Sequence, residues 1–169
     1  DKKPVGDSVA LFGDDPAVML FITPHMAVEI NRKTGLIDRW TANGKTYLGK
    51  DSCVIDVMQD RHDAWGMTFR EWREIGSFTL LSDEEGTAFS DQDATIPSIR
   101  VIEDGDVRTV VEAVYGYEGS RARVHYKLSK QAPVIDVDIR IVNQEKRKMF
   151  KLGLTPADPS STPALEVAF

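Results

Sequence analysis

Apolar and polar residues alternate along much of this chain, with the period of two that is typical of strands burying one face. The clearest example is residues 134–141, where isoleucine and valine side chains lie on one side and Asp136, Asp138 and Arg140 on the other. Residues 121–128 alternate in the same way. Further strands are predicted at residues 27–30, 36–41, 54–58, 76–81, 99–103, 107–115, 148–154 and 165–169.

Turn-forming residues separate the predicted strands. Asn-Gly at residues 43–44 and Asp-Gly at residues 104–105 adopt positive φ at little cost, which favours tight antiparallel connections. Strands about ten residues apart, joined by such turns, are typical of antiparallel sandwiches. Since no segment shows a long 3.6-residue period, the sequence predicts an all-β fold, an antiparallel β-sandwich.

Two stretches interrupt this pattern. Residues 1–24 contain three prolines around the apolar run at 18–22 and are predicted to be an irregular lead-in or linker, so the sandwich domain is expected to span residues 25–169. Residues 82–98 are predicted to be an acidic, solvated loop. Their carboxylates are not expected to bind calcium, because they lack the glycine and glutamate spacing of a helix-loop-helix calcium site. The chain begins without methionine and its last predicted strand lacks a closing turn, so we expect a longer polypeptide, truncated here at the carboxyl end.

The composition fits one globular domain. Of 169 residues, 21 are lysine or arginine and 27 are aspartate or glutamate, so the formal charge is -6, and 41% are hydrophobic. An acidic balance disfavours nucleic acid, whose phosphates are bound by clustered lysine and arginine. No apolar run approaches the roughly 18 to 20 residues of a membrane span. We therefore expect a soluble protein with neither nucleic acid nor a membrane as a partner.

The single cysteine, Cys53, cannot form an internal disulfide, and no cluster of cysteine and histidine indicates structural zinc. A reducing, cytoplasmic location is therefore expected. Cys53 itself is expected to be a small buried hydrophobic residue rather than a reactive thiol. The sequence also contains no nucleophile elbow, phosphate-binding loop, zinc-protease motif or dinucleotide fingerprint.

The densest group of chemically active residues follows the predicted strand at 54–58. Asp60, His62 and Asp63 are residue types that bind metals, and Trp65 can stack on a sugar ring. The alternative is that the two aspartates brace a loop, the histidine is exposed, and the tryptophan fills the core. The pattern is not specific enough to identify a particular metal ion.

Four stretches carry a family resemblance. The first is a strand, a Thr-Gly turn and a second strand, the second reads D-R-H-D-A-W-G, the third reads I-E-D-G-D-V-R, and the fourth contains E-K-R-K-M-F-K-L before a proline. In this order they resemble the β-sandwich region that follows the catalytic domain in family 38 α-mannosidases of the bacterial-type branch. Val142 and Asn143 depart from the pattern, since the family commonly has Asp-Trp there. The four stretches occupy residues 28–40, 60–66, 102–108 and 134–156.

The resemblance implies part of a supersandwich like that of galactose mutarotase. It also implies a parent glycosidase that hydrolyses terminal α-mannosides with retention, using an aspartate nucleophile and zinc in a preceding α/β catalytic domain. No catalytic residue, metal ligand or cofactor is therefore expected in this chain, which would pack on the catalytic domain and help to form the cleft for a mannose-containing oligosaccharide. The candidates for contact with the substrate or that domain are Asp60, His62, Asp63, Trp65 and Glu145.

Two other hypotheses remain open. The chain can be a free-standing carbohydrate-binding module that stacks sugar on Trp40, Trp65 or Trp72. It can also be a structural domain in which every tryptophan is buried and open strand edges lead to self-association.

Overall fold

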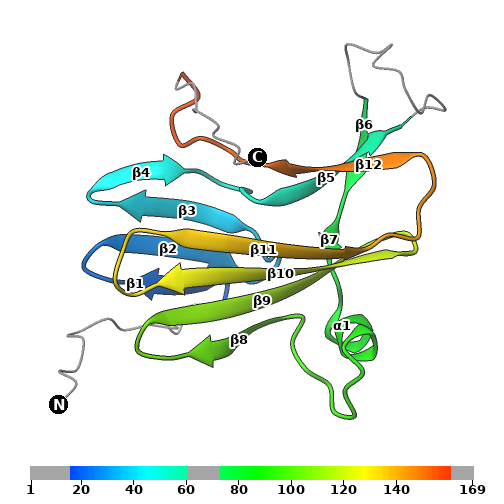
Figure 1. Ribbon diagram of the computed structural model, residues 1–169, viewed down its shortest axis with the longest axis horizontal. Helices are drawn as coiled ribbons and strands as arrows, with labels where there is room; N and C mark the ends of the chain where they lie inside the picture. The colour runs from blue at the N-terminus through cyan, green and yellow to red at the C-terminus, as the bar shows by residue number, and fades with distance from the viewer. Residues whose placement is uncertain (1–15, 61–72, 161–169) are drawn as a thin grey trace, which may run out of the picture.

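The computed structural model describes residues 16–60 and 73–160, which are built almost entirely from antiparallel strands (Figure 1). The all-β prediction is confirmed, and most strands predicted within the described residues are present with small shifts of their bounds. The strand predicted at 76–81 is instead divided into two strands that join different sheets, and the strand at 45–48 was not predicted. The predicted strand at 165–169 lies outside the described residues. The elements are β1 (Val18–Ile22), β2 (Met26–Asn31), β3 (Ile37–Ala42), β4 (Lys45–Leu48), β5 (Val54–Gln59), β6 (Glu74–Ser77), β7 (Thr79–Leu80), α1 (Asp83–Phe89), β8 (Ile99–Asp104), β9 (Arg108–Tyr117), β10 (Ser120–Ser129), β11 (Ile135–Val142) and β12 (Lys148–Gly153).

The strands form three sheets. The first has the order β1-β2-β3-β4, the second runs β11-β10-β9 with both β7 and β8 paired to β9, and the third has the order β12-β5-β6. Isolated bridges between Ile37 and Ser52 and between Leu48 and Pro156 join the first sheet to the third. In Figure 1 the second sheet lies over the first, which gives the layered arrangement of a sandwich.

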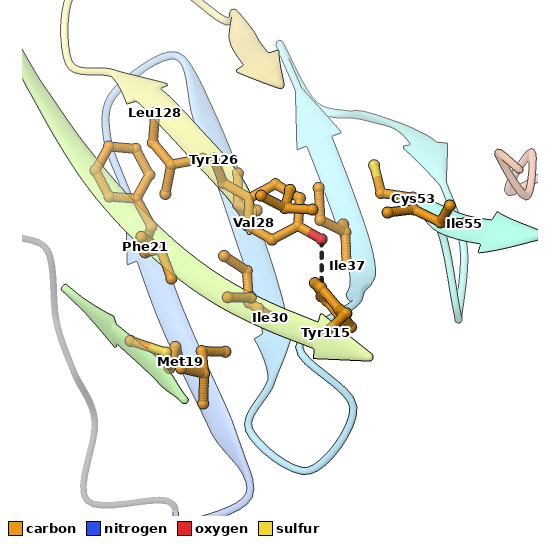
Figure 2. Close-up of a cluster of buried hydrophobic side chains, with 14 of the residues drawn as sticks. Met19, Phe21, Val28, Ile30, Ile37, Cys53, Ile55, Tyr115, Tyr126 and Leu128 are labelled. Carbon is orange, nitrogen blue, oxygen red and sulfur yellow. Dashed lines mark hydrogen bonds between the residues drawn. The ribbon is translucent and has the colours of Figure 1, made fainter. Parts of the chain in front are cut away.

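The core lies between the first and second sheets, as Figure 2 shows for a cluster of its side chains. Along β10, buried and partly exposed residues alternate without a break, so one face lies in the core and the other faces outward. Strand β9 is buried on both faces, as its β-branched run predicts. The fully buried side chains of the core include Val28, Ile30, Ile37, Val111, Tyr115, Val124, Tyr126 and Leu128.

Two buried tyrosines occupy the centre of this core. The hydroxyl groups of Tyr115 and Tyr126 lie 3.3 Å apart and form a hydrogen bond, drawn as the dashed line in Figure 2. Burial raises the pKa of both phenols, so both stay neutral. Gly35, in the turn between β2 and β3, has φ +74, and a Cβ there would lie 2.5 Å from the Tyr115 hydroxyl. The predicted Thr-Gly turn therefore requires glycine at position 35, both because φ is positive there and because a side chain would collide with Tyr115.

The expectation of an irregular lead-in over residues 1–24 is wrong for Val18–Ile22, which form β1 and pair with β2 along its whole length. Met19 and Phe21 point into the core and are almost fully buried. The hairpin closes at Thr23, whose hydroxyl accepts a hydrogen bond from the Met26 backbone N–H at 3.1 Å. The prolines at 16 and 24 therefore do not prevent residues 18–22 from forming a strand, because burial of alternate apolar side chains stabilises it.

The acidic connection at 82–98 is only partly the loop that was expected, because residues 83–89 form α1. Ser82 and Glu85 form a capping box: the Ser82 hydroxyl accepts from the Glu85 N–H, and the Glu85 carboxylate accepts from the Ser82 N–H. Gly86 lies against Ser98, where any Cβ would overlap the serine hydroxyl. Among the residues that the structure describes, no helix has the length and apolar character needed to cross a membrane.

The tyrosine pair yields a test of the core. Tyr115→Phe and Tyr126→Phe are each expected to lower the free energy of unfolding by about 1 kcal/mol, because each leaves the other hydroxyl buried without its partner. The double substitution is expected to cost less than the sum of the two single ones, since no unpaired hydroxyl then remains. Urea unfolding of the three variants provides the measurement. Strictly additive losses would contradict a hydrogen-bonded pair.

Candidate functional site

The residues singled out from sequence are only partly within the described chain. His62, Asp63 and Trp65 lie outside it, whereas Asp60 and Glu145 are described. Asp60 directly follows β5, and Glu145 lies in the connection between β11 and β12. Because β5 pairs with β12, the two residues are brought to the same end of the sandwich.

Asp60 is held there through its backbone. Its N–H donates to the carbonyl of Arg147 at 2.9 Å, which continues the pairing of Gln59 with Lys148 by one residue. Arg147 itself has φ +59, so the chain turns sharply just before β12 begins. The Asp60 side chain is half-buried. The structure thus places Asp60 where the third sheet meets the segment that carries the three other candidates.

Glu145 connects two turns at this end of the sandwich. Its side chain is 13% exposed, and one carboxylate oxygen accepts a hydrogen bond from the Gly119 N–H at 2.9 Å. The other oxygen lies 3.8 Å from the Lys148 ammonium. The Glu145 N–H donates to the side chain of Asn143 at 2.8 Å. The carboxylate is therefore engaged by groups of the domain itself, between the β9–β10 turn and the start of β12.

Lys148 is the central cation of this end cluster, which comprises Tyr117, Glu118, Glu145 and Lys148. Its ammonium lies 2.9 and 3.0 Å from the two carboxylate oxygens of Glu118 and donates to the Tyr117 hydroxyl at 3.3 Å. It also lies 4.8 Å from the centroid of the tyrosine ring, within range of a cation–π contact. The hydrogen bond from Lys148 lowers the pKa of Glu118, and the same bond raises the pKa of Lys148.

A second polar cluster lies on the outer face of the second sheet, around the buried side chain of Glu112 on β9. The carboxylate accepts hydrogen bonds from the Arg100 guanidinium and, at 2.8 Å, from His125 Nε2. Arg123 Nε lies 3.3 Å from the same oxygen as His125. Three basic groups from β8 and β10 thus surround one carboxylate that is 5% exposed.

The strand register explains why these groups meet. Arg100 pairs with Glu112, Glu112 with His125, and His125 with Asp138, so one cross-strand row of charged and polar residues crosses β8, β9, β10 and β11. Directly opposed residues in antiparallel strands lie close enough for their side chains to interact. Arg123 lies beside this row, with its guanidinium 5.5 Å from the Phe89 ring of α1. We call Arg100, Glu112, Arg123, His125 and Asp138 the charged row.

Sequence reasoning missed both the charged row and the role of Lys148. A signal for the row was present: Glu112 is a lone carboxylate within a run predicted to be buried, and a buried carboxylate needs basic partners. The outward positions of residues 121–127 carry arginine, arginine, histidine and lysine, which are such partners. Lys148 gave no comparable signal, because its contacts come from a turn about 30 residues away in the chain.

The remaining residues of interest from the sequence are two tryptophans and the cysteine. Trp40 is half-buried, packs against the core and lies 5.4 Å from the Tyr47 ring, which disfavours it as an exposed platform for sugar. Trp72 lies outside the described residues. Cys53 is buried, as expected, and burial raises the pKa of its thiol to about 11. In the described ranges, no three histidine, cysteine or carboxylate side chains are placed to hold a metal ion.

The charged row makes a prediction for stability. Glu112→Gln is expected to lower the free energy of unfolding by about 3 kcal/mol, because it leaves two guanidinium groups without their buried counter-charge. Glu103→Gln is the matched control: its carboxylate pairs with Arg108 but is 43% exposed, so a much smaller loss is expected. Urea unfolding curves compare the two. Equal losses would contradict a special role for the row.

The end cluster makes a prediction for titration. Lys148→Gln is expected to raise the pKa of Glu118 toward its ordinary value of 4.5, because the hydrogen bond that favours the carboxylate is removed. A lowered pKa in the folded state stabilises the fold above the unfolded pKa, and this contribution is lost as the pH falls. The variant should therefore lose stability less steeply on acidification. NMR titration of the Glu118 carboxyl carbon measures the shift, and Lys146→Gln, on an exposed neighbour, should leave it unchanged.

Comparison with known proteins identifies the family. A family model described as "Glycosyl hydrolases family 38 C-terminal domain" matches residues 22–162. This range runs from the last residue of β1 through β12 and contains both polar clusters. A comparison with curated proteins gave no match. Placement in the bacterial-type branch stays a prediction, but the match extends over most of the chain, which therefore belongs to the glycosyl hydrolase family 38 C-terminal domain family.

Proposed function

We propose that this chain is the non-catalytic β-domain of an α-mannosidase that removes terminal α-mannosyl residues with retention. Its function is to pack on the catalytic domain of the same polypeptide and help form the cleft that receives a mannose-containing oligosaccharide. The observation that carries the proposal is the family match, which covers nearly all of the described sandwich and describes a C-terminal domain of glycosyl hydrolases.

The engagement of the buried carboxylates supports a non-catalytic role. A retaining glycosidase needs two carboxyl groups about 5 to 5.5 Å apart, both directed at the sugar. Glu112 is surrounded by Arg100, Arg123 and His125, and Glu145 accepts from Gly119 beside Lys148. Carboxylates engaged in this way hold strands and turns together and are poorly placed to attack or protonate a glycoside.

Zinc is assigned by the proposal to the catalytic domain. The described side chains include no group of three potential ligands in position to bind the ion, so they do not fit it. No cofactor is proposed for this chain. Cytoplasmic location likewise stays a prediction.

The end of the sandwich that carries Asp60 is the part proposed to face the cleft. The described charged groups there include three carboxylates and two cations, namely Asp60, Glu118, Glu145, Arg147 and Lys148. Because most of these groups are engaged with one another, their charges largely cancel, which suits an uncharged sugar better than a strongly charged ligand. Asp63 and Trp65, which follow Asp60 in the chain, are the residues proposed to contact the oligosaccharide or the catalytic domain.

The experiment has two arms. The chain alone is expected to release no product from an aryl α-mannoside with zinc present, because the catalytic groups lie in another domain. In the polypeptide that also contains the catalytic domain, Trp65→Ala is expected to raise KM for mannobiose about tenfold, the effect of losing about 1.4 kcal/mol of stacking contact. It should change KM for methyl α-mannoside far less, since that substrate has a single ring and is too short to reach the cleft wall.

Steady-state kinetics on the two substrates measure the difference, with Trp40→Phe as the control on a tryptophan that packs against the core. Turnover by the chain alone would overturn the non-catalytic role. An equal change of KM for both substrates would overturn the role of Trp65 in the cleft.

A further inference from the structure

Strand β11 has a free edge within the described part of the chain. It has eight residues and pairs on one side with β10, and no described strand pairs with its other side. An edge of this length presents a row of backbone N–H and C=O groups that can pair with another extended chain. Residues 135–142 therefore provide a place where the second sheet can be continued.

The inner face of β11 is also less well covered than that of its neighbour. On β10 the inward side chains are fully buried, with Ala122, Val124 and Tyr126 at 0% exposure. On β11 the corresponding side chains, Ile135, Val137, Ile139 and Ile141, are only partly buried although they belong to the same core. The layer of apolar side chains under β11 is therefore not fully covered by the described residues.

Apolar side chains of the first and third sheets are exposed as well. Leu152 on β12 pairs with buried Ile55, yet it is 46% exposed, and Tyr47 on β4 is also 46% exposed. Trp40, which contacts Tyr47, has a buried indole N–H without a partner in the described residues. Strands β3, β4, β5 and β12 extend past the free edge of β11 in Figure 1. A strand added to β11 would therefore lie over this uncovered apolar layer.

The charges on the outer face of β11 define which strand fits. Asp136 is exposed, and Arg140 is 75% exposed with its nearest carboxylate, Asp138, at 3.7 Å. Asp138 is already paired with Lys127. An antiparallel strand would best place an acidic residue opposite Arg140 and a basic residue opposite Asp136, with apolar residues at the alternate positions facing the layer below.

We propose that β11 pairs with an extended amphipathic strand supplied by a neighbouring domain of the same polypeptide. This proposal rests on the proposed function, since it specifies one surface through which the chain packs on that domain. Backbone hydrogen bonds along β11 would give the affinity, and alternate apolar side chains would cover the exposed inner layer. A second copy of the chain fits less well. In each copy the first sheet extends past the free edge of β11, so pairing two β11 strands would bring the two first sheets into the same space.

The first test uses a synthetic peptide as the strand. The peptide is acetyl-Val-Glu-Val-Thr-Val-Lys-Val-amide, whose antiparallel register places glutamate opposite Arg140 and lysine opposite Asp136. Hydrogen exchange of the 169-residue chain is measured with and without the peptide at millimolar concentration. Exchange of the edge-facing amides of residues 135–142 is expected to slow about tenfold. The Ser129 N–H donates to the Val134 carbonyl, so the even-numbered residues of β11 face β10 and the odd-numbered ones face the free edge. The matched control is the same peptide with proline in place of its third residue, whose N–H would donate to Ile139. This control should have no effect, since proline cannot donate to the strand.

Charge reversal tests the register. Arg140→Glu is expected to weaken binding of the peptide about fivefold, because it opposes two carboxylates. A peptide with lysine in place of its glutamate should restore binding to this variant. Since Arg140 is exposed, the variant is expected to fold, and Lys33→Glu, at an exposed position in the turn between β2 and β3, is the control. Loss of binding by both peptides, or by the control variant, would overturn the register.

The source of the strand is tested in the polypeptide that includes the catalytic domain. There, the edge-facing amides of β11 are expected to be protected without peptide, and the peptide should add nothing. Rapid exchange in that polypeptide would overturn the proposal, as would a dimer of the isolated chain, found by sedimentation, with β11 already protected. These outcomes are independent of mannoside hydrolysis, so failure here is distinguishable from failure of the proposed function.

Discussion

The approach of Tyr115 to the backbone of Gly35 is the contact on which the rest of the sandwich depends. A side chain at position 35 would collide with the tyrosine hydroxyl, and the backbone there already has positive φ. The turn between β2 and β3 can therefore lie directly against the ring, which sets the spacing of the first and second sheets at the centre of the core. Tyr126 completes the contact by giving the buried Tyr115 hydroxyl a partner.

Tyr115 belongs to β9, the central strand of the second sheet, and β9 is buried on both faces. Its outer face then has to bury Glu112, and a buried carboxylate is tolerated only with basic partners. The register supplies them from β8 and β10, and α1 brings Phe89 against Arg123. The charged row is thus a consequence of placing a glutamate in the middle of the sheet, and it gives the second sheet an outer layer of charged side chains.

The end cluster and the free edge of β11 have different consequences for function. At the end of the sandwich, Lys148 and Glu145 tie the β9–β10 turn to the start of β12, so the segment after Asp60 begins from a well-supported position. Along the flank, by contrast, half-buried apolar side chains and an unpaired strand leave the interior uncovered within the described residues. The end cluster therefore holds the end of β5 in place, whereas the flank of β11 is the surface that the proposed packing on a neighbouring domain would cover.

Alternation of apolar and polar residues by itself determined most of the strands and the all-β class, because both depend on neighbours in the sequence. Turn-forming residues likewise located the Asn-Gly and Asp-Gly connections, and residue type alone predicted the burial of Cys53. Local signals for β1 and α1 were also present, but prolines and acidic residues obscured them. Only the tertiary structure decided that Glu112 meets Arg100 and His125, that Glu145 is engaged by Gly119 and Lys148, and that β11 lies at an edge. The physical reason is register: pairing between strands distant in the chain brings these side chains together, and no pattern within one strand specifies its partner.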